Sequence, residues 1–229
     1  FALPMILGNL LQQLYNVADT LIVGRCLGPD ALAAVGSSYS LMTFLTSILL
    51  GLCMGSGVCF SILFGSREEE KLQESIFVSF VVIAAAAALL TGAVLALIDP
   101  ILRALQIQER IYGMTRAYVR VVFLGIPFTF LYNYFASLLR AIGNSAVPLV
   151  FLGVSAVLNV VLDLVFVLVL SRGVAGAAEA TVISQAVSAA CIALYAFRRA
   201  PQLRPRRSEL RLRRQAVGKI FSYSFLTCV

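Results

Sequence analysis

Residues 148–170 read PLVFLGVSAVLNVVLDLVFVLVL, an apolar run that contains one carboxylate, Asp163. Residues 1–24, FALPMILGNLLQQLYNVADTLIVG, repeat the pattern around Asp19. Because a helix rises ~1.5 Å per residue, each run is long enough to cross the ~30 Å hydrocarbon core of a bilayer. A carboxylate at that depth is costly and normally faces a bundle interior or a wet cavity. The two aspartates are therefore the first candidates for a functional site.

The composition of the chain indicates an integral membrane protein. Hydrophobic residues make up 60% of it, charged residues make up 13%, and the mean hydropathy is +0.94. The apolar runs are continuous and rich in Ala and Leu, whereas the strands of a membrane barrel alternate over about ten residues. The sequence therefore predicts an all-α membrane protein built as a helix bundle.

Six apolar runs of spanning length follow one another with short connections between them. They cover residues 2–23, 37–64, 76–98, 118–142, 147–170 and 174–197, which we take as six transmembrane helices forming one lobe. The chain starts inside the first run, and residues 220–229 read as the opening of a seventh. We therefore expect an N-terminal six-helix lobe, residues 1–197, of a longer protein.

The basic residues predict the orientation of this lobe. Residues 198–219, RRAPQLRPRRSELRLRRQAVGK, hold nine basic residues and the single acid Glu209, so the positive-inside rule makes this segment a cytoplasmic linker. Six crossings return the N-terminus to the same side. The charge is a topological signal and a contact for anionic headgroups, so no nucleic acid is expected as a partner. We expect the chain to be a multi-pass protein of the bacterial plasma (inner) membrane, with its N-terminus cytoplasmic.

Polar residues of three runs fall at one depth in this topology. Asp19 and Asp163 each lie about two turns from the outer ends of their runs, and Thr181 enters from that side to the same level. Asn159 precedes Asp163 by four residues and Asn16 precedes Asp19 by three, so each amide shares a helix face with its carboxylate. Such oxygen ligands suit a proton, Na⁺ or an organic cation. The alternative is that these groups only join helices by hydrogen bonds.

Soft-metal and catalytic sites find no support in the sequence. The five cysteines are scattered without a CxxC spacing, and the chain has no histidine. We expect no cofactor beyond a coupling ion, and no enzyme activity. Prolines in or beside spans are a separate signal, because proline removes a backbone hydrogen bond and weakens a helix locally. Pro4 lies about four turns from Asp19 on the same helix and is a candidate bending point.

Several longer motifs together carry a resemblance. They are PMILGNLLQQLYNVADTLIVGRCLGPDALAAVG at 4–36, the glycine-rich second run, the G-x-P at 125–127, RAIGNSAVP at 140–148, LNVVLDLVFV at 158–167 and GVAGAAEATVISQ at 173–185. In these the chain resembles the N-terminal half of a MATE (multidrug and toxic compound extrusion) transporter. The resemblance implies a twelve-helix protein of two lobes that exports cationic or amphipathic drugs in exchange for H⁺ or Na⁺. A C-terminal lobe and the bilayer are the other partners it implies.

The resemblance also implies a site. The cation site of the family falls on Asp19, Tyr118, Asn159, Asp163 and Thr181, where Tyr118 rests on position alone, and its bending proline falls on Pro4. Na⁺ would be held by the carboxylates with Asn159 and Thr181.

Glu179 departs from the family, which usually has an apolar residue there. It is two residues from Thr181 and so ~200° around the helix. It is either an interface contact or an extra protonatable site. Asn16, on the first run, is another possible accessory residue of the cation site.

Two other functions stay open on the sequence. A flippase for lipid-linked saccharides or peptidoglycan precursor has a similar fold, but it would be expected to show a strongly cationic cavity, and the spans hold few Arg or Lys. An intramembrane aspartyl protease also pairs two membrane aspartates. That class needs a GxGD motif, which neither VAD at Asp19 nor VLD at Asp163 supplies.

Overall fold

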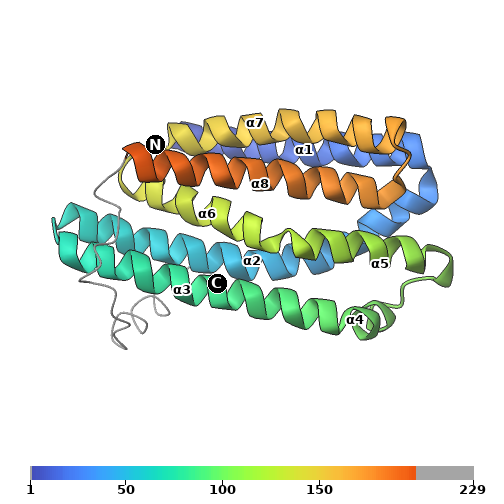
Figure 1. Ribbon diagram of the computed structural model, residues 1–229, viewed down its shortest axis with the longest axis horizontal. Helices are drawn as coiled ribbons and strands as arrows, with labels where there is room; N and C mark the ends of the chain where they lie inside the picture. The colour runs from blue at the N-terminus through green and yellow to red at the C-terminus, as the bar shows by residue number, and fades with distance from the viewer. Residues whose placement is uncertain (1, 200–229) are drawn as a thin grey trace.

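The computed structural model describes residues 2–199, and this part of the chain is helical with no strand. The linker and seventh-span predictions for 200–229 lie outside the described residues. The helices are α1 (Ala2–Leu27), α2 (Pro29–Gly65), α3 (Glu69–Ala96), α4 (Ile98–Ala104), α5 (Glu109–Leu124), α6 (Ile126–Ala141), α7 (Ala146–Asp163), the π-helix η1 (Leu164–Val169) and α8 (Gly173–Arg199). Figure 1 shows the long helices aligned along one axis, with α1 and α7 on one side and α3 and α4 on the other.

Most of these helices qualify as membrane spans. Within residues 2–199, α2, α3, α7 with η1, and α8 are each long and apolar enough to cross a bilayer, and α5 with α6 makes a fifth if the bent pair is one span. The 26-residue α1 has the length, but amides and Asp19 interrupt its apolar run. Its crossing, and so the six-span arrangement, stays a prediction.

The fourth expected span, 118–142, is not one straight helix. The chain bends by 42° between α5 and α6, at Gly125. A Cβ on Gly125 would lie 2.5 Å from Cγ2 of Val182, so α8 can approach this bend only because the residue is glycine. Pro127 follows at the start of α6, where a missing N–H costs no helical hydrogen bond. The bend thus brings α6 against α8.

The main core lies between α2, α3, α5, α6 and α8. At its centre Tyr134 is 1% exposed and packs edge-on against Phe60 and Phe80. Its hydroxyl donates to the carbonyl oxygen of Ile76 at 2.6 Å, so the one polar atom in this aromatic cluster is satisfied. On the outside, α1 and α7 expose rows of Leu, Val and Ile, as expected for surface that meets lipid. The bundle is therefore apolar outside as well as in this core.

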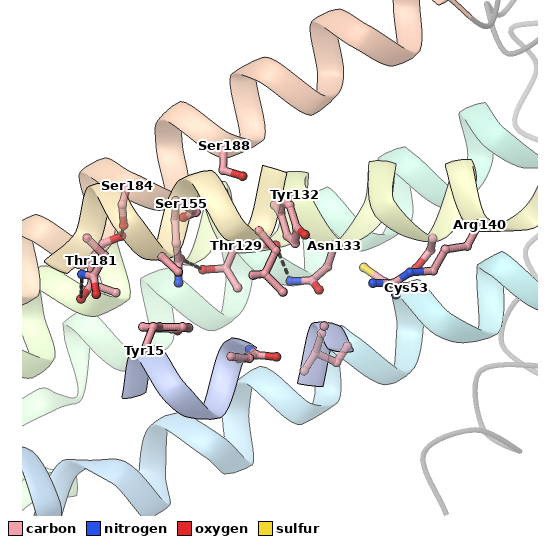
Figure 2. A pocket seen from close by; sticks show the side chains of 18 of the residues that line it. Tyr15, Cys53, Thr129, Tyr132, Asn133, Arg140, Ser155, Thr181, Ser184 and Ser188 are labelled. Atoms are coloured by element: carbon pink, nitrogen blue, oxygen red, sulfur yellow. Dashed lines mark hydrogen bonds between the residues drawn. The ribbon is translucent and has the colours of Figure 1, made fainter. Parts of the chain in front are cut away.

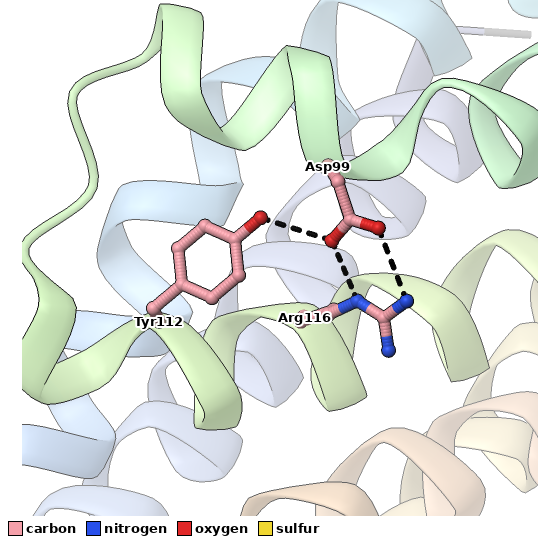
Figure 3. Close-up of polar contacts among 3 residues, drawn as sticks. All are labelled: Asp99, Tyr112 and Arg116. Atoms are coloured by element: carbon pink, nitrogen blue, oxygen red, sulfur yellow. Dashed lines mark hydrogen bonds and ion pairs between the residues drawn. The ribbon is translucent and has the colours of Figure 1, made fainter.

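Ion pairs collect at the end of the bundle where α4 and α5 meet. Arg116 donates to both carboxylate oxygens of Asp99, at 2.7 and 3.1 Å, and the hydroxyl of Tyr112 donates to the same carboxylate at 2.9 Å (Figure 3). The Arg116 guanidinium, followed by the Tyr112 hydroxyl, holds the pKa of Asp99 below its usual range. Arg110 pairs in the same way with Asp30, which ties the start of α2 to α5.

Candidate cation site and polar cavity

Asp19 and Asp163 come together inside the bundle. Asp19 lies on α1 and is 9% exposed, whereas Asp163 is the last residue of α7 and is 0% exposed. Their carboxyl groups are close enough to interact directly. No protein donor reaches Oδ1 of Asp19 or either carboxylate oxygen of Asp163 within the described residues. Two buried carboxylates this close cannot both stay charged without a counter-charge, so the pair favours a shared proton or a bound cation.

Asp163 lies where the helix geometry changes. The π-helix η1 begins at the next residue, and the N–H of Leu170 donates to the carbonyl of Val165 at 2.9 Å in the wider turn. Such π segments are rare and often occur at functional sites. The sequence LDLVFVLVL reads as ordinary helix, so this local change could not be predicted from it.

An amide and a hydroxyl adjoin the pair from α7 and α8. Asn159 is 1% exposed, and its Nδ2 donates to Oγ1 of Thr181 at 3.2 Å. The Thr181 hydroxyl donates in turn to the carbonyl of Ala177 at 3.1 Å. Oδ1 of Asn159 is left without a partner in the described part of the chain. This contact joins two of the residues expected at one depth.

Two tyrosines complete the surroundings of the carboxylates. Tyr118 on α5 is 5% exposed and interacts electrostatically with Asp19 and Asp163. Tyr15 does the same from α1, one turn before Asp19. The sequence argument named Asn16 as the residue on the face of Asp19, but Nδ2 of Asn16 donates to Oε1 of Gln13 at 3.3 Å. Tyr15, four residues before Asp19, therefore reaches the site, whereas Asn16, three residues before it, does not. The i,i+4 spacing of Tyr15 and Asp19 was a signal that could have identified Tyr15.

A chain of side chains leads from the carboxylates to α6. Tyr15 interacts with Gln185 of α8, and Gln185 accepts a hydrogen bond from the hydroxyl of Thr129. Thr129 stands one turn after Gly125, so the bend described above positions it. The sequence contained a signal for Gln185, because it follows Thr181 by four residues and so lies on the same helix face. These contacts link α1, α6 and α8 beside the carboxylate pair.

A polar cavity of about 310 Å³ lies between α1, α2, α6, α7 and α8, and Tyr15, Thr129 and Gln185 contribute to its lining. Figure 2 shows Thr181 and Ser184 at one end of it and Arg140 at the other, with Thr129 and Asn133 between them. Its polar lining comprises Gln12, Tyr15, Thr129, Tyr132, Asn133, Ser137, Arg140, Ser155, Asn159, Thr181, Ser184, Gln185 and Ser188. Asn159 and Thr181 belong to both the cavity and the surroundings of Asp163. Most of the lining was not identified from the sequence, because isolated serines are common in membrane helices.

The remaining candidates lie elsewhere. Glu179 forms an ion pair with Arg172, in the turn between η1 and α8. No described interaction joins it to Asp19 or Asp163. Pro4 falls in the first turn of α1, which continues as one helix to Leu27.

The unpartnered atoms define what the site can hold. They are oxygens of two carboxylates and one amide, with the Thr181 hydroxyl alongside. Oxygen sets of this kind fit hard cations such as Na⁺, and a carboxyl pair also fits a proton. No group of three or more His, Cys, Asp or Glu side chains among the described residues is arranged to hold a metal ion, so the set does not resemble a transition-metal centre.

An apolar helix bundle around a buried polar cavity and a carboxylate pair defines a multi-pass membrane protein of the transporter class. Comparison with known proteins gives the family. The MatE family model matches residues 4–165, and the chain belongs to this family.

The curated relatives are named as multidrug resistance or multidrug export proteins. The chain is 34% identical to the probable multidrug resistance protein YpnP of Bacillus subtilis, over 82% of this chain and 42% of the relative. It is 28% identical to the multidrug export protein MepA of Staphylococcus saprophyticus, over 98% of this chain and 50% of the relative. The chain thus spans about half the length of the curated relatives it matches.

Solved structures agree with the fold. A MOP-superfamily transporter from Pyrococcus furiosus matches with a TM-score of 0.91 and 26% identity, over 98% of this chain and 50% of that one. MATE structures described as bent and straight match at 26% identity with TM-scores of 0.91 and 0.90, over 99% and 98% of this chain and half of theirs. The resemblance to MATE transporters found in the sequence is therefore confirmed. The predicted fold, an all-α helix bundle that forms one lobe of a transporter, is confirmed as well.

Proposed function

We propose that the protein is a secondary antiporter that exports cationic or amphipathic compounds in exchange for H⁺ or Na⁺. The observation that carries the proposal is the buried pair Asp19 and Asp163, in which Oδ1 of Asp19 and both carboxylate oxygens of Asp163 lack a donor among the described residues. A bound coupling ion would supply the positive charge that compensates these carboxylate oxygens. The family and the names of the relatives support the drug-export part.

Alternating access would follow from loading of this pair. In the charged state the carboxylates favour water or a cation beside them, and so a wetter, more open lobe. Once neutralised, they tolerate closer packing of α1 against α7. By its resemblance to the family's bending proline, Pro4 in the first turn of α1 is the proposed place where this closer packing bends the helix. If the coupling ion is Na⁺, it would be held by Asp19, Asp163, Asn159 and Thr181. If it is H⁺, protonation of one carboxyl group would neutralise the pair instead.

The proposal includes the setting of the lobe. The full-length protein would be multi-pass in the bacterial inner membrane with its N-terminus cytoplasmic, and would pair this lobe with a C-terminal one. The positive-inside rule supports this orientation through the basic segment 198–219.

The test uses the full-length protein in proteoliposomes, with pH and Na⁺ gradients imposed separately. We expect drug efflux under one gradient, loss of that efflux in Asp19→Asn, and retained folding of the variant by size-exclusion chromatography. Pro4→Ala should slow turnover while equilibrium drug binding is largely preserved. Ion-driven efflux at the wild-type rate by Asp19→Asn would overturn the proposal. Normal turnover by Pro4→Ala would remove only the bending point.

A further inference from the structure

Among the described residues, Arg140 is the one charged residue in the lining of the polar cavity, and it differs from the other basic residues. Every other Arg and Lys among residues 2–199 is exposed, whereas Arg140 is half-buried. Arg110, Arg116 and Arg172 have carboxylate partners. In the described part of the chain, no hydrogen bond or ion pair joins Arg140 to another side chain. A half-buried cation without a counter-charge among the described residues favours an anion beside it.

The surroundings of Arg140 suit an anionic group. Ser137 precedes it by one turn on α6, is 7% exposed, and has no described hydrogen-bond partner for its hydroxyl. Both side chains reach the same cavity, so they present donors to one space. A guanidinium holds its donors in a planar fork that matches the two oxygens of a carboxylate. No acidic residue of the described part of the chain lines the cavity to compete for it.

The two ends of the cavity have opposite character. Thr181 and Asn159 lie at the end beside Asp163, where a positive charge is favoured. Arg140 follows Thr129 by eleven residues along α6, roughly 16 Å of helix, and Figure 2 shows it at the opposite end. A ligand that lies along the cavity can therefore place a cationic group near one end and an anionic group at the other.

We propose that Arg140 and Ser137 form a subsite for the anionic group of the transported compound, so that this lobe takes zwitterions with a carboxylate besides simple cations. This inference rests on the proposed export function and names a substrate class for it. The same anionic chemistry is offered by a lipid phosphate at the membrane surface, which the experiment must separate from a substrate carboxylate.

The experiment uses a matched pair of xanthene dyes, the zwitterionic free carboxylate and its cationic methyl ester. Binding of each to the purified full-length protein in phosphatidylcholine nanodiscs is measured by fluorescence anisotropy. We expect Arg140→Gln to weaken binding of the free carboxylate at least about tenfold, as loss of a charge-assisted bond implies, and to change binding of the ester less than about twofold. Arg140→Lys should restore part of the carboxylate affinity. Arg120→Gln, an exposed arginine on α5, is the matched control and should change neither dye.

Three results would overturn the subsite. If Arg140→Gln weakens binding of both dyes equally, Arg140 is a structural residue. If it weakens binding of neither dye, Arg140 does not bind the carboxylate. Nanodiscs that contain phosphatidylglycerol provide the lipid arm. If anionic lipid competes with both dyes in the wild type and with neither in Arg140→Gln, the anion is a headgroup and not the substrate. Failure of the export function is seen separately, as ester efflux that does not depend on an ion gradient or on Asp163.

Discussion

Asp163 and Asp99 are the same residue type in opposite surroundings. Asp99 is at the α4 and α5 end, where Arg116 and Tyr112 donate three hydrogen bonds to its carboxylate. Asp163 is fully buried, and within residues 2–199 no protein donor reaches either of its oxygens. A carboxylate that the chain satisfies can only hold helices together. A buried carboxylate that the chain leaves unsatisfied can bind, release and respond to a cation.

The largest effect that tests this comparison is expected from Asp163→Asn. The amide cannot accept a proton or neutralise Na⁺, so ion-driven efflux in proteoliposomes should fall by more than about tenfold, a loss of ~1.4 kcal/mol or more in transition-state stabilisation. Because the change removes an unpartnered buried carboxylate, the melting temperature in detergent should stay equal or rise.

Glu179→Gln is the control for this variant, since Glu179 pairs with Arg172 at the η1 to α8 turn. Its efflux should remain within about twofold of wild type, as expected for a partly exposed ion pair. If the Glu179 variant alone lost ion-dependent efflux, the site would have been assigned to the wrong carboxylate.

An intermediate effect is expected at the bend that positions Thr129 near the site. Gly125→Ala places a Cβ against Val182, and such overpacking costs about 1–3 kcal/mol. The fraction of monodisperse protein should fall at lower temperature in a thermal series. Val182→Ala in the same chain makes room for the added methyl and should recover most of the loss. A Gly125→Ala protein as stable as wild type would show that α8 can move away without cost.

The smallest effect is expected from Asp99→Asn, which should leave efflux unchanged. The folded pKa of Asp99 is lowered, mainly by Arg116, so its charged form adds stability above the ordinary carboxyl pKa of about 3.9. This contribution is lost as the pH falls through the lowered folded pKa. The melting-temperature difference between wild type and variant should therefore be present at neutral pH and vanish in strong acid. A difference that grows in acid would contradict the assigned ion pair.

The sequence determined the class of the protein, the helices and most of the carboxylate site. Continuous apolar runs have few alternatives to membrane helices, and the i,i+4 rule with a common depth brought Asp163, Asn159 and Thr181 into one group before any coordinates. The resemblance to the family added Tyr118, by its position alone. These features depend on local spacing and on the thickness of a bilayer, both of which a sequence carries.

The tertiary structure decided which polar residues share a space. Tyr15, Gln185 and Thr129 come from three helices and meet only because Gly125 bends the chain and lets α8 approach. Arg140 lies near the end of the expected span 118–142, and only the structure places it in the lining of the cavity. The physical reason is that helix rotation and tilt are set by packing between neighbours, which the pattern of a single helix does not contain.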